Sequence, residues 1–221
     1  MTDMEAMRAR HSVRQYENKP LGDKQAVALR EEIEACNALS GLHIQLVANE
    51  PRAFDGLMAH YGKFSGVKNY IALVGKKGPD LDEKCGYYGE RLVLLAQSLG
   101  LNSCWVAMSY DKSKAGCKLD AGEKLCVVIS LGYGATQGVP HKSKSAEQVM
   151  AAKGEVPQWF RAGVEAALLA PTAMNQQKFK FVLEDGAVAA SAGMGFYSKV
   201  DLGIAKYHFE LGAGRKNFRW K

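Results

Sequence analysis

The segment from Tyr87 to Leu99 limits the possible folds of this chain more than any other feature. Apolar residues in it recur at helical spacings of three and four and extend around most of the circumference. They are Leu92, Val93, Leu94, Leu95, Ala96 and Leu99. A helix with so little polar surface predicts burial on two sides, and Gly100 is placed to end it.

Apolar segments of strand character lie before and after this helix. Alternation predicts a half-buried strand at Leu42–Ala48, whereas the continuously apolar Tyr70–Val74 is typical of a central strand. Two further strands are expected at Cys104–Ala107 and Leu125–Leu131.

Capping residues predict where two helices near the N-terminus begin. Thr2 and Glu5 fit a capping box, which predicts a short helix over Asp3–Arg10, followed by an extended Ser12–Tyr16. Asp23 can cap a second helix. Its expected apolar face consists of Ala26, Leu29, Ile33 and Cys36.

The pattern starts again after Ala135–Lys144, a stretch of glycine, proline, lysine and serine that predicts a linker. Ser145 and Gln148 fit a second capping box, and Pro157 suits the first turn of a helix running towards Leu169. The later expected elements are a strand over Phe179–Leu183 and a last helix capped by Asp201, running through Leu211 and ended by Gly212 and Gly214.

Composition and charge exclude several classes of protein. No apolar run is long enough to cross a bilayer, and the charged start MTDMEAMRAR is unlike a secretory signal, so we expect a soluble cytoplasmic protein. The five cysteines lack a C-x-x-C pair and the histidines lack metal-ligand spacing, which argues against a disulfide framework or a zinc site. The formal charge of +6 suits an anionic ligand, but the scattered lysines argue against nucleic acid.

Cationic and hydroxyl side chains gather directly after the first predicted helix. Because alternate side chains of an extended segment project to one side, Arg10, Ser12 and Arg14 should converge on one point. Two guanidinium groups and a hydroxyl suit a phosphate. The alternative is a solvated surface, which two arginines near a serine form more often.

A second candidate binding segment, Ala170–Gln177, lies between a predicted helix and a predicted strand. Its small residues, its proline and its three carboxamides would let the backbone approach a flat ligand and offer it donors and acceptors. The alternative is a helix end followed by a polar turn.

Three segments together resemble the nitroreductase family. Arg10–Pro20 (RHSVRQYENKP) resembles the family's opening R-x-S-x-R/K segment, which binds the phosphate and ribityl chain of FMN. Gly100–Met108 (GLNSCWVAM) is similar to the segment that lines the flavin from the opposite side, and Pro171–Phe179 is similar to the P-S-x-x-N-x-Q-P-W loop, which contacts the isoalloxazine. The resemblance implies FMN contacts from Arg10, His11, Ser12, Arg14, Ala107, Met108, Pro171, Thr172, Ala173, Asn175, Gln177 and Arg215.

The order of these motifs departs from the family pattern. In the family, the P-S-x-x-N-x-Q-P-W loop, called the Pro/Asn loop below, follows the opening motif by a few tens of residues. Here Ala35–Gly41 (ACNALSG) occupies that place, and Pro171 lies far downstream. We infer that the chain consists of two fused family-like halves. Residues 1–137 carry the phosphate-binding segment that begins at Arg10, and residues 138–221 carry the Pro/Asn loop. Within the loop, Thr172, Lys178 and Phe179 replace the family's Ser, Pro and Trp.

The resemblance implies a nitroreductase-like α+β fold, with a central mixed or antiparallel sheet flanked by helices. It also implies an FMN-dependent oxidoreductase that takes hydride from NADH or NADPH and reduces nitroaromatic or quinone-like acceptors. Since flavin carries that chemistry, no catalytic side chain and no metal are expected, and the chain should be a monomer or homodimer. The alternatives are a flavin protein with another redox reaction or none and, more remotely, a basic nucleic-acid-binding domain.

Overall fold

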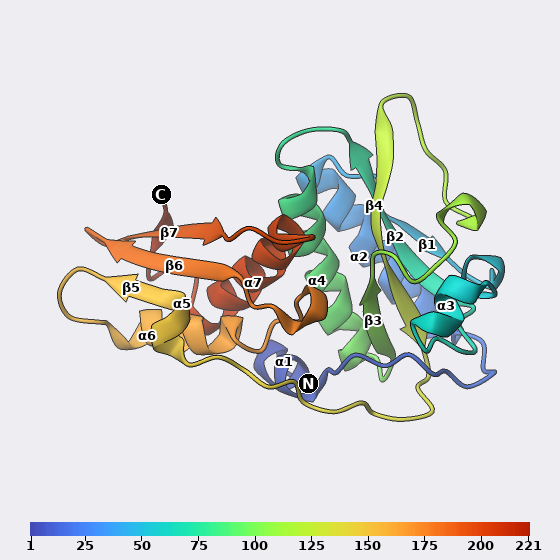
Figure 1. The fold of residues 1–221 in the computed structure, drawn as a ribbon, viewed down its shortest axis with the longest axis horizontal. Helices are drawn as coiled ribbons and strands as arrows, with labels where there is room; N and C mark the ends of the chain where they lie inside the picture. The colour runs from blue at the N-terminus through green and yellow to red at the C-terminus, as the bar shows by residue number, and fades with distance from the viewer. The chain divides into compact units, whose positions relative to one another are not determined.

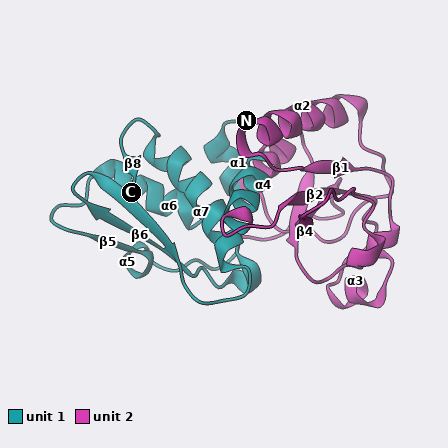
Figure 2. Cartoon of the chain, turned by 90° about the horizontal axis from the view of Figure 1, so that it is seen from above, with its two compact units in different colours: residues 1–8, 82–91, 141–221 teal, residues 9–81, 92–140 magenta.

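All 221 residues are described in a computed structural model, which has the predicted α+β fold class (Figure 1). By contacts the chain divides into two compact units (Figure 2). Unit 1 comprises residues 1–8, 82–91 and 141–221, and unit 2 comprises residues 9–81 and 92–140. This division is made by contacts, whereas the two predicted halves follow chain order.

Unit 2 is built on a four-stranded antiparallel sheet in the order β1-β2-β4-β3. Its strands are β1 (Gln45–Val47), β2 (Asn69–Lys76), β3 (Asn102–Val106) and β4 (Glu123–Gly132). Residues Tyr70 to Val74 of β2 are fully buried, and β2 pairs on both edges, so the predicted central strand is confirmed. The first predicted strand exists but is shorter than Leu42–Ala48.

The long helix of unit 2, α2 (Asp23–Ser40), buries Leu29, Ile33 and Cys36 of the predicted apolar face and packs against β1. The predicted cap is wrong: Gly22 is the N-cap, and Asp23 is already helical. The helix ends at Gly41, whose φ of 71° is the left-handed conformation that glycine adopts freely. The shorter helices α3 (Leu57–Tyr61), η1 (Arg52–Phe54) and η2 (Lys112–Lys114) were not predicted.

Unit 1 contains a second sheet, in the order β5-β6-β7-β8, with one antiparallel and two parallel pairings. Its strands are β5 (Met150–Ala152), β6 (Phe179–Glu184), β7 (Ala187–Ala192) and β8 (Arg219–Trp220). Strand β6 confirms the prediction for Phe179–Leu183, and its side chains alternate between buried and more exposed. Strands β5 and β7 were not predicted.

Helices α1 (Asp3–Ala9) and α5 (Ala146–Val149) confirm the two predicted capping boxes. Thr2 N donates to Glu5 Oε2 at 2.8 Å, and Glu5 N donates to Thr2 Oγ1 at 3.2 Å. Because each box joins residues three apart, local sequence is enough to specify it.

The remaining helices are α4 (Leu81–Ser98), α6 (Gln158–Ala167) and α7 (Ser198–Ala213). Helix α4 begins six residues before the predicted Tyr87, and Pro157 is the N-cap of α6 rather than part of its first turn. The predicted cap of α7 is also wrong, because the helix begins at Ser198 and Asp201 lies within it, buried. Gly212 is likewise helical, and Gly214 is the C-cap.

Aromatic side chains fill the core of unit 1 between its sheet and α7. Phe209 of α7 stacks on Phe181 of β6, with ring centroids 4.6 Å apart, and it also contacts Phe160, Phe218 and Trp220 edge-on or tilted. Such contacts stabilise a core beyond the apolar area they bury.

Two glycines allow a close approach between α7 and residues 82–91 of α4. A Cβ atom added to Gly203 would collide with the carbonyl oxygen of Glu83, and one added to Gly86 would collide with that of Val200. Neither obstacle is a flexible side chain, so this packing requires glycine at both positions.

The structure also bears on the expectations about membrane-spanning segments and cysteines. No helix is both long and apolar enough to span a membrane. None of the five cysteines forms a disulfide, and all except Cys117 are buried.

Candidate functional site

The segment Arg10–Arg14 runs alongside β3 in unit 2, as an extended chain. Ser12 forms an isolated parallel bridge with Ser103, and Val13 N donates to Ser103 O at 3.0 Å. Val13 is buried in the core of unit 2, whereas Ser12 is partly buried and Arg14 is exposed. The predicted extended conformation is confirmed.

The three side chains predicted to converge share one neighbour, the thiol of Cys104 on β3. Burial raises the pKa of this thiol, while the charge of Arg14, a hydrogen bond with Ser12 and the charge of Arg10 act in the opposite direction. Both guanidinium charges and the Ser12 side chain therefore act on a single buried atom. Nothing in the sequence singled out Cys104, which was expected only as an apolar strand residue.

Arg10 is the most unusual member of this phosphate arm, by which we mean Arg10, Ser12 and Arg14. It is only 4% exposed, and its buried Nε has no hydrogen-bond partner. A buried charged group without full hydrogen bonding is costly, so such a donor calls for a binding explanation. An anionic group at this position would supply the missing acceptor, and a phosphate fits that requirement.

The other predicted residues of unit 2 lie close to the arm in sequence or follow β3. His11 is partly buried, and its Cβ lies beside Gly138. Ala107 and Met108 follow β3, and Met108 is 64% exposed. Arg14 is also exposed, with its guanidinium carbon 5.9 Å from the centre of the Phe64 ring.

The Pro/Asn loop, residues 170–177 of unit 1, has an unusual backbone. Met174, Asn175 and Gln177 have φ angles of 51°, 53° and 45°. Asparagine tolerates this left-handed region, but for the other two residues it is uncommon and costs about 1–3 kcal/mol each. Three such residues within four positions persist only where the surrounding contacts enforce them.

Those contacts come mainly from the carboxamide of Gln177, which is 3% exposed. Its Oε1 accepts from Lys144 N at 2.9 Å, and its Nε2 donates to Lys142 O and Asn175 Oδ1, each at 2.8 Å. Asn175 Nδ2 also donates to Lys142 O at 2.8 Å. Asn175 thus uses one donor on Lys142 O and one lone pair on Gln177, which leaves one N–H and one lone pair for a ligand.

Thr172 and Pro171 complete the base of the loop. The Thr172 hydroxyl accepts from Gln177 N at 3.0 Å, and Pro171 is buried. The hydroxyl that replaces the family's serine is therefore used to close the loop.

Asp201 of α7 anchors the same loop, a role that sequence reasoning missed. Its Oδ1 accepts from Ala173 N at 2.9 Å and its Oδ2 from Gln176 Nε2 at 2.7 Å. Burial raises the pKa of Asp201 to about 6, although both hydrogen bonds lower it. The residue was predicted to cap its own helix, and no local signal distinguishes that role from a contact with a distant loop.

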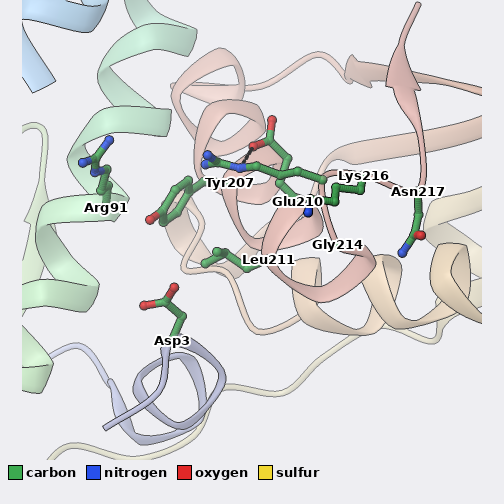
Figure 3. A pocket seen from close by; sticks show the side chains of 9 residues that line it. Asp3, Arg91, Tyr207, Glu210, Leu211, Gly214, Lys216 and Asn217 are labelled. Atoms are coloured by element: carbon green, nitrogen blue, oxygen red, sulfur yellow. Dashed lines mark ion pairs between the residues drawn. The ribbon is translucent and has the colours of Figure 1, made fainter.

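Arg215 lies in unit 1 at a pocket of about 780 Å³ formed by residues of α1, α4, α7 and the segment after α7 (Figure 3). Its Nε pairs with Glu210 Oε2 at 2.8 Å, and its Nη2 donates to the Tyr87 hydroxyl at 2.9 Å. Tyr87 and Trp220 also donate to Glu210, at 2.6 and 2.8 Å. A contact with flavin phosphate would use the remaining N–H groups of Arg215, and it stays a prediction.

The candidate site residues thus fall into two sets. The phosphate arm with His11, Ala107 and Met108 lies in unit 2, and the Pro/Asn loop and Arg215 lie in unit 1. The Pro/Asn loop is ordered by Gln177 and Asp201, and Arg215 separately by Glu210 and Tyr87. That both sets enclose one flavin stays a prediction.

Comparison with known proteins places the chain in a family. Residues 3–213 match the model of the family described as "Putative TM nitroreductase". The chain belongs to this nitroreductase family. The family is one of oxidoreductases. The match covers nearly the whole chain, so the predicted resemblance is confirmed.

Solved structures share the nitroreductase fold at low sequence identity. A protein of Thermotoga maritima entitled a putative nitroreductase is 23% identical, with a TM-score of 0.66 over 98% of this chain and 85% of that one. A putative nitroreductase from Desulfovibrio desulfuricans, solved in complex with FMN, is 22% identical, with a TM-score of 0.54 over 71% of this chain and 99% of that one. A putative NADH dehydrogenase/NAD(P)H nitroreductase from Bacteroides thetaiotaomicron is 20% identical, with a TM-score of 0.53 over 66% and 95% of the two chains. No curated protein matched the sequence.

Proposed function

We propose that this nitroreductase-family chain binds FMN and transfers hydride from NADH or NADPH to a nitroaromatic or quinone-like acceptor. The observation that carries the proposal is the phosphate arm, in which Arg10 is buried with its Nε unpartnered. A relative of the same fold is entitled as a complex with FMN, which supports that cofactor.

The phosphate arm would hold the anionic end of the cofactor. Arg10 offers a desolvated guanidinium, Arg14 offers an exposed one, and Ser12 adds a short donor. Hydrogen bonds from guanidinium groups to phosphate are charge-assisted and strong. Since the bridge to Ser103 holds the backbone of Ser12, this segment needs little ordering when the ligand binds.

The Pro/Asn loop would hold the planar end. Asn175 retains one donor and one acceptor, the alternating pattern that the edge of the isoalloxazine requires. The buried carboxamide of Gln177 and the carboxylate of Asp201 hold the loop backbone in its strained conformation. The loop is therefore shaped before ligand binding, which lowers the entropy cost of association.

When bound, FMN supplies the two-electron chemistry that the protein side chains lack. The arginines of the arm would add positive charge beside the cofactor, and the loop would orient it. The name of the Bacteroides thetaiotaomicron protein, a putative NADH dehydrogenase/NAD(P)H nitroreductase, supports a reduced nicotinamide as the donor. The runner-up function is a flavin protein of this fold that carries out another redox reaction or none.

Anaerobic spectroscopy of the FMN-reconstituted chain tests this function. We expect NADH or NADPH to bleach the flavin bands, and a stoichiometric nitroaromatic or quinone to restore them. Flavin that binds but stays oxidised with both donors would favour the runner-up. A chain that retains no flavin would overturn the whole proposal.

A further inference from the structure

Three side chains of unit 2 that play no part in the proposed flavin site converge on one point. They are His43, between α2 and β1, and the pair Asp120 and Glu123 at the start of β4. Their ligand atoms all lie within 4.8 Å of one another. His43 Nδ1 is 2.9 Å from Glu123 Oε2 and 4.0 Å from Asp120 Oδ2.

The backbone fixes the position of each member. His43 N donates to Val74 O at 2.8 Å, which holds this residue against β2. Glu123 N donates to Asp120 O at 3.0 Å, and Asp120 N donates to Glu123 Oε2 at 2.8 Å. The intervening turn uses Gly122 at a φ of 81°, so both carboxylates are presented from one tight turn.

A side-chain clamp ties the two segments together. Gln45, two residues after His43, donates from Nε2 to Lys118 O and accepts from Lys118 N at Oε1, both at 2.8 Å. Lys118 lies two residues before Asp120, so the clamp holds the histidine and the turn in register. The backbone segments that carry the three ligands are thus pre-positioned, which lowers the cost of binding an ion.

His43 Nδ1 and Glu123 Oε2 lie 2.9 Å apart and share a hydrogen bond, so a bound ion would replace the proton between them. At 4.0 Å, Asp120 Oδ2 is too far from His43 Nδ1 for a hydrogen bond. Two ligands of one zinc ion, each at about 2.0–2.2 Å from it, lie roughly 3–4 Å apart. The position of Asp120 therefore suits a shared ion better than a direct contact with the ring.

The charge and exposure of the three side chains also suit a cation. Two carboxylates and one imidazole gather at this point, so up to two negative charges face a bound cation. The side chain of Asp120 is 79% exposed and that of His43 is 33% exposed, so an ion and its water ligand can reach the site.

We propose that His43 Nδ1 and the carboxylates of Asp120 and Glu123 bind a divalent transition-metal ion of the zinc type. One imidazole and two carboxylates match the ligands of Zn²⁺, whereas Mg²⁺ and Ca²⁺ prefer oxygen ligands alone. The ion joins the connection before β1 to the turn before β4. Because it binds the folded chain, it also stabilises that chain against unfolding.

Calorimetric titration of the tag-free, EDTA-treated full chain with ZnCl₂ tests this site. We expect one Zn²⁺ per chain, and binding at least about tenfold weaker in His43→Ala and in Asp120→Asn. The matched controls His60→Ala and Asp185→Asn, both at exposed positions elsewhere, should bind as the wild type does. Cys117→Ser should also be unchanged, which separates this site from binding by the one cysteine that is not buried.

Several results would overturn the proposal. They are the absence of saturable Zn²⁺ binding, unchanged affinity in either ligand variant, or loss of binding in Cys117→Ser. Displacement of Zn²⁺ by a tenfold excess of Mg²⁺ would also contradict it, because these ligands should favour zinc. A thermal shift with Zn²⁺ that persists in His43→Ala would place the ion elsewhere.

Discussion

A buried pair in unit 1, Glu90 of α4 and His208 of α7, gives a sharp test of how this unit is held together. Both side chains are fully buried, and His208 Nε2 lies 2.9 Å from Glu90 Oε1. His208 Nδ1 lies 3.1 Å from the carbonyl oxygen of Ala166, which can only accept, so Nδ1 carries a proton. The pair therefore shares one further proton between Nε2 and the carboxyl group.

This geometry predicts different costs for two substitutions of Glu90. Glu90→Ala leaves the imidazole Nε2 buried without this partner and opens a cavity, so we expect a loss of about 3–5 kcal/mol. Glu90→Gln keeps the shape, and its amide can donate to Nε2 of a neutral histidine. We expect that variant to lose only about 1 kcal/mol.

Thermal and urea unfolding measure these effects. For a chain of this length each kcal/mol corresponds to roughly 2–4 °C, so Glu90→Ala should lower Tm by roughly 6–20 °C and Glu90→Gln by about 2–4 °C. Glu155→Ala, at an exposed position, is the control and should change stability by less than about 0.5 kcal/mol. Equal losses in the two Glu90 variants, or a loss below about 1 kcal/mol in Glu90→Ala, would refute the argument.

Two further predictions concern α7. Burial raises the pKa of Asp201 from its ordinary 3.8 to about 6, so between these pH values the native state binds more protons than the unfolded state. The free energy of unfolding should therefore fall as pH rises across this window, by at most about 3 kcal/mol, and Asp201→Asn should remove that decline. Urea unfolding from pH 4 to 7 measures it. The same dependence of the free energy of unfolding on pH in both proteins would contradict this prediction. Gly203→Ala should lower the free energy of unfolding by about 1–3 kcal/mol or more, because its Cβ meets the backbone of Glu83. The control Gly56→Ala has open space around it and should lower that free energy by less than about 1 kcal/mol. Similar Tm values for the two variants would contradict the close packing of α7 against α4.

Features specified by neighbouring residues could be predicted from the sequence. The capping boxes before α1 and α5 depend on residues three apart, and the apolar run of β2 needs burial on both faces wherever it lies. Likewise, the spacing of Arg10, Ser12 and Arg14 sets their common side in any extended chain.

Features that depend on distant partners could not be predicted. The alanine-rich β7 has little strand character of its own and forms because β6 and β8 pair with it. Asp201 carries the sequence signal of a cap, but its partners Ala173 and Gln176 lie 25 or more residues away. In the same way, no spacing rule joins His43 to the turn that precedes β4.

FMN titration of the apo chain, followed by flavin fluorescence, tests the central claim most directly. We predict saturation at one FMN per chain, with Arg14→Ala binding about ten- to a hundredfold more weakly, because a charge-assisted contact contributes about 1.5–3 kcal/mol. Arg30→Ala removes the same charge from an exposed position of α2 and should bind like the wild type. Absence of saturable binding, or equal affinity in the two arginine variants, would contradict the assignment of the phosphate arm.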